Sequence, residues 1–155
     1  MEAKNLEVNL QMNDRIKSFR YCHEDTPLAQ SVESIHTTNI TPYKFSRVGN
    51  YPKLTSLGLW QCLIDELPDS FENLKTLEDL DLSTNLFDQI PDQILKLPQL
   101  KTLDMSHQNL RNYDNLTRGV LPQLETFVLS GDSADYEEDR RIARKHLPSR
   151  INVVS

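Results

Sequence analysis

Two aspartates, Asp79 and Asp81, are the residues whose types and spacing come closest to a recognisable chemistry. Carboxylates two positions apart point to the same side of an extended strand, where they could share a divalent cation in a metal-dependent hydrolase or transferase. However, Leu80 and Leu82 belong to a regular leucine pattern, so the two acids are better explained as the outward residues of a strand. We therefore expect neither a metal ligand nor a catalytic residue here.

Other signatures of catalysis or ligand binding are missing from the sequence. The four histidines form no HExxH or HxH pattern, and there is no GxSxG, P-loop or GxGxxG motif. Cys22 and Cys62 form no CxxC pair, which predicts reduced thiols instead of a disulfide framework or a zinc knuckle. The sequence thus predicts a protein that is not an enzyme and binds no cofactor.

Charge and hydropathy exclude further classes of partner. The formal net charge is -6 and the pI is about 5.2, which disfavours binding to nucleic acid or to anionic lipid. No apolar stretch is long enough to cross a bilayer, and the N-terminus lacks the apolar segment of a secretion signal. We expect a cytoplasmic protein with no nucleic-acid or membrane partner.

The elements that position these residues come from an internal repeat. The pattern Leu-x-x-Leu-x-Leu, followed by a return segment containing Pro-x-x-Phe/Ile-x-x-Leu, starts at Leu54 and recurs at Leu77, 23 residues later at every matched position. A third copy starts at Leu100 and carries one extra residue around 108–110, so that a fourth starts at Leu124. A weaker copy starts at Val32, and residues 16–21 keep the strand spacing alone.

This spacing predicts stacked coils. The last two leucines of Leu-x-x-Leu-x-Leu point to the same side of a short strand, and one coil cannot bury them alone. Stacking makes a parallel sheet with a shared apolar interior. Where the chain turns off the strand, a polar side chain can bond backbone groups that the turn leaves unpaired. We expect such a structural ladder at Asn39, Cys62, Asn85 and Asn109.

These repeats resemble the leucine-rich-repeat family, in particular the 23-residue class with LPxxIxxL on its return side, as in Ras-suppressor-like and bacterial repeat proteins. The resemblance implies an α/β fold: a right-handed solenoid of about five or six coils, with a parallel sheet on its concave side and short α-helical, 3₁₀ or irregular convex segments. We expect one domain over 1–155. Residues 1–31 form an N-terminal cap or degenerate coil, 32–131 the repeats, and 132–155 a cap of one helix and one closing strand.

Recognition is then expected at the outward-facing strand positions. Trp60 is the only tryptophan, and exposed aromatic side chains are enriched in binding hot spots. Gly58, two residues earlier, is expected to leave a gap beside it, although Trp60 could instead cover Tyr43 or another N-terminal residue. The predicted protein-binding residues are His36, Gly58, Trp60, Asp79, Asp81, Ser83, Asp104 and Ser106.

Three hypotheses about function follow. The first is a protein-interaction module whose strand face binds a protein, with an acidic ladder of Asp79, Asp81 and Asp104 that fits either a basic patch on the partner or an ordinary solvated surface. The alternative is a structural unit that self-associates weakly through its degenerate N-terminal coils. The third is a divalent-metal-dependent enzyme that uses Asp79 and Asp81.

Overall fold

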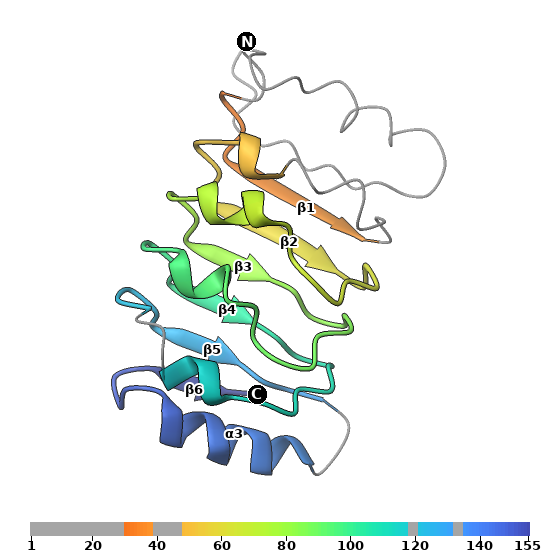
Figure 1. Cartoon of the computed structure of the whole chain (residues 1–155), viewed down its shortest axis with the longest axis vertical. Coiled ribbons are helices and arrows are strands. Elements are labelled where there is room, and N and C mark those ends of the chain that lie inside the picture. Colours follow the sequence, from red (N-terminus) through yellow and green to blue (C-terminus); the bar gives the residue numbers. More distant parts are fainter. Residues whose placement is uncertain (1–29, 39–47, 118–120, 132–134) are drawn as a thin grey trace.

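The computed structural model describes residues 30–38, 48–117, 121–131 and 135–155, and all structural statements below concern these residues. They form one six-stranded parallel sheet in which the strand order follows the chain order (Figure 1). The strands are β1 Ser34–Thr38, β2 Ser56–Trp60, β3 Asp79–Asp81, β4 Thr102–Asp104, β5 Thr126–Val128 and β6 Asn152–Val154. The predicted solenoid of stacked coils is confirmed.

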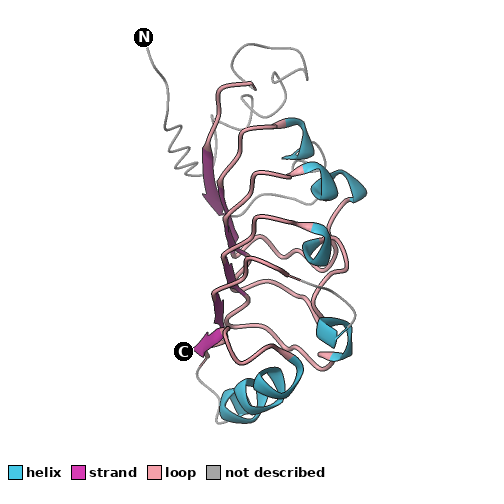
Figure 2. Cartoon of the chain, turned by 90° about the vertical axis from the view of Figure 1, so that its left-hand side faces the viewer, coloured by secondary structure: helices cyan, strands magenta, loops and turns pink. Residues whose placement is uncertain are grey.

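Short 3₁₀ helices form the return side of the coils. They are η1 Val48–Asn50, η2 Asp69–Asn73, η3 Ile94–Lys96 and η4 Asp114–Thr117. Figure 2 shows the strands along one side of the molecule and these helices along the other. In two coils the segment begins after the predicted proline: the Phe71 N–H donates to the Pro68 carbonyl at 2.9 Å, and the Ile94 N–H donates to the Pro91 carbonyl at 3.0 Å.

The core is a set of side-chain rows that run from coil to coil between the two sides. The register places Leu57, Leu80, Leu103 and Phe127 in one row, and each of them is at most 1% exposed. A fully buried leucine stabilises the fold by roughly 1.5–3 kcal/mol relative to an exposed one. The inward direction predicted for Leu80 is therefore confirmed, and the residues flanking it face outward.

The extra residue of the third repeat lies later than predicted. The backbone still follows the 23-residue offset at Asn112, which bridges to Gln89, and at Tyr113, which is buried like Ile90. The offset has become 24 at Leu121, which is buried like Leu97. The insertion therefore lies between Tyr113 and Leu121, where a longer return segment is accommodated without shifting the strand register.

The C-terminal end is covered by the predicted helix and strand. Helix α3, Asp135–His146, packs against β6, and β6 pairs in parallel with β5. Arg140 donates to the Leu129 carbonyl at 2.7 Å and Arg144 to the Val153 carbonyl at 2.9 Å, so cationic side chains pair carbonyls at the end of the solenoid. The first residues of the predicted C-terminal cap, 132–134, and the strand spacing at 16–21 lie outside the described residues.

None of the helices in the described part of the chain is long and apolar enough to cross a membrane.

Candidate functional site

Asn85 joins two coils at the point where the chain leaves β2 and β3. Its Oδ1 accepts hydrogen bonds from the backbone N–H groups of Cys62 at 3.0 Å and Ile64 at 3.1 Å. Its Nδ2 donates to the carbonyls of Leu59 and Leu82, each at 2.7 Å, and to that of Ser83 at 3.2 Å. Asn85 is only 5% exposed, so these backbone groups have little access to water. Its predicted structural role is confirmed.

The ladder continues at Gln108 and not at Asn109. Gln108 accepts a hydrogen bond from the Phe87 N–H at 3.1 Å and donates to the Leu82 carbonyl at 3.0 Å, while Asn109 is exposed. The assignment of Asn109 was wrong because the inserted residue lies further along the chain, which leaves Gln108 at the 23-residue offset from Asn85. Cys62, the ladder residue predicted one coil earlier, is buried, and its thiol donates to the Trp60 carbonyl at 3.3 Å. Asn39 lies outside the described residues.

The outward side chains of β1 to β5 form a surface that we call the sheet face. One row across it runs through Ser34, Ser56, Asp79, Thr102 and Thr126, and the next through His36, Gly58, Asp81, Asp104 and Val128. The face is therefore mostly hydroxyl and carboxylate groups carried by a rigid sheet. Five of the predicted binding residues lie in these two rows.

Trp60 is the large aromatic side chain of the sheet face. It lies at the end of β2, pairs with Thr38 of β1 and is partly exposed. Its ring lies beside that of His36, with the ring centroids 6.5 Å apart and the planes inclined by 49°. The His36 Nε2 atom is in turn 3.1 Å from the Ser56 hydroxyl. Trp60 is thus held on one side by an imidazole that is itself anchored.

The gap predicted at Gly58 is occupied by His36. A Cβ atom at position 58 would come within 2.4 Å of the His36 Nδ1 atom, so only glycine lets the imidazole lie across this strand. The prediction of an open notch beside Trp60 was therefore wrong. Gly58 makes room for the residue that supports Trp60, which gives it an indirect part in shaping the face.

Asp81 and Asp104 have a structural contact in addition to their exposure. Each accepts a hydrogen bond from the backbone N–H two residues later, Asp81 from Ser83 and Asp104 from Ser106, both at 2.8 Å. Short polar side chains commonly bond the backbone in this way where a strand turns. Asp81 and Asp104 are direct register partners, whereas the more exposed Asp79 pairs with Thr102.

One basic residue borders these acids. The Lys101 ammonium group lies 2.6 Å from the Glu78 carboxylate at the start of the strands. The hydrogen bond to Glu78 raises the pKa of Lys101. The positive charge of Lys101 is neutralised mainly by Glu78, and both side chains are half-exposed. The pair therefore does not neutralise Asp79, Asp81 and Asp104.

Ser106 is the predicted binding residue that the structure removes from the surface. It is 3% exposed, and its hydroxyl accepts a hydrogen bond from the Ser130 N–H at 3.0 Å. The chain has already begun to turn after Met105, so strand alternation no longer directs this side chain outward. Ser83, one coil earlier, is partly exposed, and its carbonyl accepts a hydrogen bond at 3.1 Å from the N–H of Gln61, the residue after Trp60.

The described residues contain no group of three or more histidine, cysteine, aspartate or glutamate side chains arranged to hold a metal ion.

Similarity to known proteins agrees with this geometry. Residues 52–110 match the family model described as leucine rich repeat. The fold matches that of a leucine-rich-repeat protein from Leptospira interrogans with a TM-score of 0.63 and 25% sequence identity, over 96% of this chain. This chain has the leucine-rich-repeat solenoid fold. None of the curated proteins matches it in sequence.

A second solved structure, an internalin from Listeria monocytogenes, matches with a TM-score of 0.61 and 20% identity over 96% of this chain. The chain spans only 36% of the Leptospira protein and 39% of the internalin. The comparison therefore shows that this chain has the leucine-rich-repeat fold.

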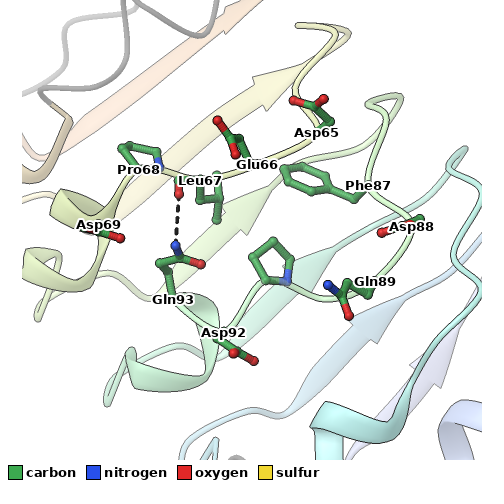
Figure 3. A pocket seen from close by; sticks show the side chains of 11 residues that line it. Asp65, Glu66, Leu67, Pro68, Asp69, Phe87, Asp88, Gln89, Asp92 and Gln93 are labelled. Atoms are coloured by element: carbon green, nitrogen blue, oxygen red, sulfur yellow. Dashed lines mark hydrogen bonds between the residues drawn. The ribbon is translucent and has the colours of Figure 1, made fainter.

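Sequence reasoning missed a second surface of this leucine-rich-repeat solenoid, on the flank where the chain runs from the strands to the return side. Leu63 and Leu86 follow the ladder residues directly and are 69% and 57% exposed, whereas the next residues, Ile64 and Phe87, are buried. The repeat spacing could have predicted this exposure, because only the second residue after each ladder position points back into the coil. A hollow of about 510 Å³ lies on the same flank (Figure 3).

Proposed function

We propose that this leucine-rich-repeat solenoid binds a protein partner through its sheet face, without catalysing a reaction. Solenoids present extended surfaces of this kind to other macromolecules. The observation that carries the proposal is the placement of Trp60, a partly exposed aromatic side chain held against His36 on an otherwise polar sheet. A rigid aromatic residue of this kind buries a large area at little conformational cost when a partner covers it.

The charge of the sheet face indicates the kind of partner. Asp79, Asp81 and Asp104 lie on adjacent strands within two rows of the face, and the net charge of the chain is -6. Such a surface attracts a basic patch and repels an acidic one. We therefore propose a protein whose contact surface carries lysine or arginine around a pocket for Trp60.

Replacing Trp60 by alanine tests the anchor. We expect Trp60→Ala to weaken binding by roughly 2 kcal/mol or more, the usual size of a hot-spot effect, with little change in melting temperature. The partner would first be isolated from the native host by affinity purification and then titrated as a pure protein by calorimetry. Thr126→Ala, on β5 of the same face, is the matched control and should bind normally. Unchanged affinity of Trp60→Ala, or its unfolding, would contradict the proposal.

The acidic residues are expected to act on the association rate. Changing Asp81 and Asp104 together to asparagine removes two charges while keeping an oxygen that can accept the Ser83 and Ser106 N–H bonds. We expect slower association with a weaker dependence on salt, and little change in dissociation, because charges of this kind steer the encounter. Stopped-flow measurements at several ionic strengths would show this. Glu137→Gln with Glu138→Gln on α3 is the control of equal charge, and an equal loss of rate in that control would argue against steering by the sheet face.

The other two hypotheses find less support in the described residues. Asp79 and Asp81 have no third ligand, and the proposed self-association rests on N-terminal residues outside the described ranges. Light scattering over a range of concentrations distinguishes self-association, since a stable monomer is expected. A melting temperature raised by magnesium or manganese would favour the enzyme hypothesis. The cytoplasmic location stays a prediction.

A further inference from the structure

We propose that the flank of the solenoid carries a second binding surface, separate from the sheet face, for a basic peptide segment of a partner protein that presents apolar side chains. This surface, which we call the leucine flank, consists of Leu63, Asp65, Leu86 and Asp88. Leu63 and Leu86 occupy the same position in successive coils, as do Asp65 and Asp88, 23 residues apart in each case. The Leu86 N–H donates to the Ile64 carbonyl at 2.8 Å, so the two coils lie side by side here.

The fold does not need leucine at these positions. Ile64 and Phe87 already fill the core, and they are 0% and 1% exposed. Leu63 has a φ of 54°, in the left-handed region that favours glycine or asparagine and is unfavourable for most other residues. At the same position of the next coil the chain has Asn109, which is exposed. A polar residue is thus compatible with this turn, and the apolar pair is a local departure from what the repeat requires.

Leu63 and Leu86 are the two large apolar side chains that are exposed among the described residues. Isolated exposed leucines are common on protein surfaces and need no explanation. These two are stacked on neighbouring coils, where successive chains lie about 4.8 Å apart. Together they form one apolar strip that an extended or helical segment could cover.

A hollow on the same flank is lined by residues that follow the two leucines in each coil, starting at Asp65 and Phe87, and not by the leucines themselves. Its volume is about 510 Å³, and it lies between two successive coils, with Asp65, Glu66 and Asp88 around its rim in Figure 3. The Gln93 Nε2 atom donates to the Leu67 carbonyl at 3.0 Å across the coils and closes one side. A side chain from a partner could therefore enter between the coils while its neighbours cover the leucines.

The charge of the hollow favours a basic segment of the partner. The described residues that line the hollow include five carboxylates, Asp65, Glu66, Asp69, Asp88 and Asp92, and no lysine, arginine or histidine. Lys96 is paired with Glu72 and attracted by Asp69 and Asp92. Arg111 lies on the next coil, where its backbone N–H donates to the Asp88 carbonyl at 2.7 Å. The five lining carboxylates outnumber these cations, so the hollow stays negative. A segment with lysine or arginine beside leucine-like residues complements it, whereas nucleic acid and anionic lipid are repelled.

A peptide of alternating leucine and lysine tests the proposal, because its lysines and leucines can contact the carboxylates and the apolar strip at the same time. Binding of the fluorescently labelled peptide to the full chain would be measured by anisotropy. Two control peptides keep the lysines with serine in place of leucine, or keep the leucines with glutamate in place of lysine. We expect the leucine–lysine peptide to bind, and each control peptide to bind roughly tenfold more weakly or worse.

Substitutions on the leucine flank test which residues bind the peptide. Leu63→Asn with Leu86→Asn copies the residue found at Asn109, so this double variant should fold with an unchanged melting temperature, yet bind the peptide at least about tenfold more weakly. Asp65→Asn with Asp88→Asn should weaken binding and reduce its dependence on salt. Trp60→Ala, which alters the sheet face, should bind the peptide normally.

Methyl NMR on leucine-labelled protein locates the contact. Signals of Leu63 and Leu86 should shift during the titration, and the signal of the buried Leu80 should not. The proposal is overturned if the wild-type chain binds no peptide, if the leucine double variant binds as well as wild type, or if only Trp60→Ala loses binding. In the last case the peptide occupies the sheet face, and the function proposed for that face stands without a second surface.

Discussion

Leu80→Asp is expected to lower the free energy of unfolding by at least about 4 kcal/mol, or to prevent folding altogether. Leu80 is 1% exposed and lies between Leu57 and Leu103 in the central row of the core. The substitution removes apolar contacts worth about 2–5 kcal/mol and adds a carboxylate with no buried partner. Every neighbouring coil shares this row, so the loss spreads to both interfaces of the coil.

Thermal melting followed by circular dichroism measures this effect. Asp79→Ala is the matched control, since Asp79 directly precedes Leu80 but is exposed, and its melting temperature should stay near that of the wild type. A wild-type melting temperature for Leu80→Asp would mean that the inward and outward positions of β3 are exchanged. The register of the sheet face, and with it the proposed binding residues, would then be wrong as well.

Asn85→Ala is expected to cost about 3 kcal/mol, at the upper end of the range for buried polar groups that lose their partners. The side chain of Asn85 accepts from two backbone N–H groups and donates to three carbonyls of two successive coils. Alanine fills none of these roles, and the site is too buried for free access of water. Hydrogen exchange of the Cys62 and Ile64 amides should become faster, because both lose their acceptor.

Asn109→Ala provides a sharp control for the ladder. The repeat pattern predicts the same role for Asn85 and Asn109, whereas in the structure Gln108 makes the corresponding hydrogen bonds. We expect Asn109→Ala to be neutral within about 0.5 kcal/mol and Gln108→Ala to be destabilising, since exposed substitutions away from such bonds have little effect. Equal losses for Asn85→Ala and Asn109→Ala would contradict the structure at this turn.

The spacing of leucines determined the architecture of this protein. The 23-residue offset from Leu54 to Leu77 predicts the inward row of the core and the parallel sheet, because a strand has a side-chain period of two and one coil cannot bury its apolar residues alone. The helix and closing strand at the C-terminus could be predicted for a related reason: the charge order of residues 135–145 suits a helix, and Pro148 ends it.

The roles of residues that do not follow the repeat period could be assigned only from the tertiary structure. A one-residue insertion can be placed at several points of a return segment without changing the strand pattern, so the sequence could not choose between Gln108 and Asn109. The position of His36 over Gly58 joins two strands 22 residues apart, and no local pattern predicts which side chain fills the space above a glycine. Ser106 is buried because the chain turns off β4 after Asp104, so the in-and-out alternation of the strand no longer sets the direction of this side chain.

The candidate binding residues also fall into those that the sequence predicts and those that only the structure shows. Sequence could identify Trp60 and the aspartates as outward residues, because strand alternation sets direction, and the structure added that Asp81 and Asp104 also bond the backbone. Only the structure showed that Leu63 and Leu86 are exposed on neighbouring coils and that the residues after them line an acidic hollow. Periodicity reports which residues recur, whereas exposure depends on how the chain turns after each strand and on which neighbouring coil covers it.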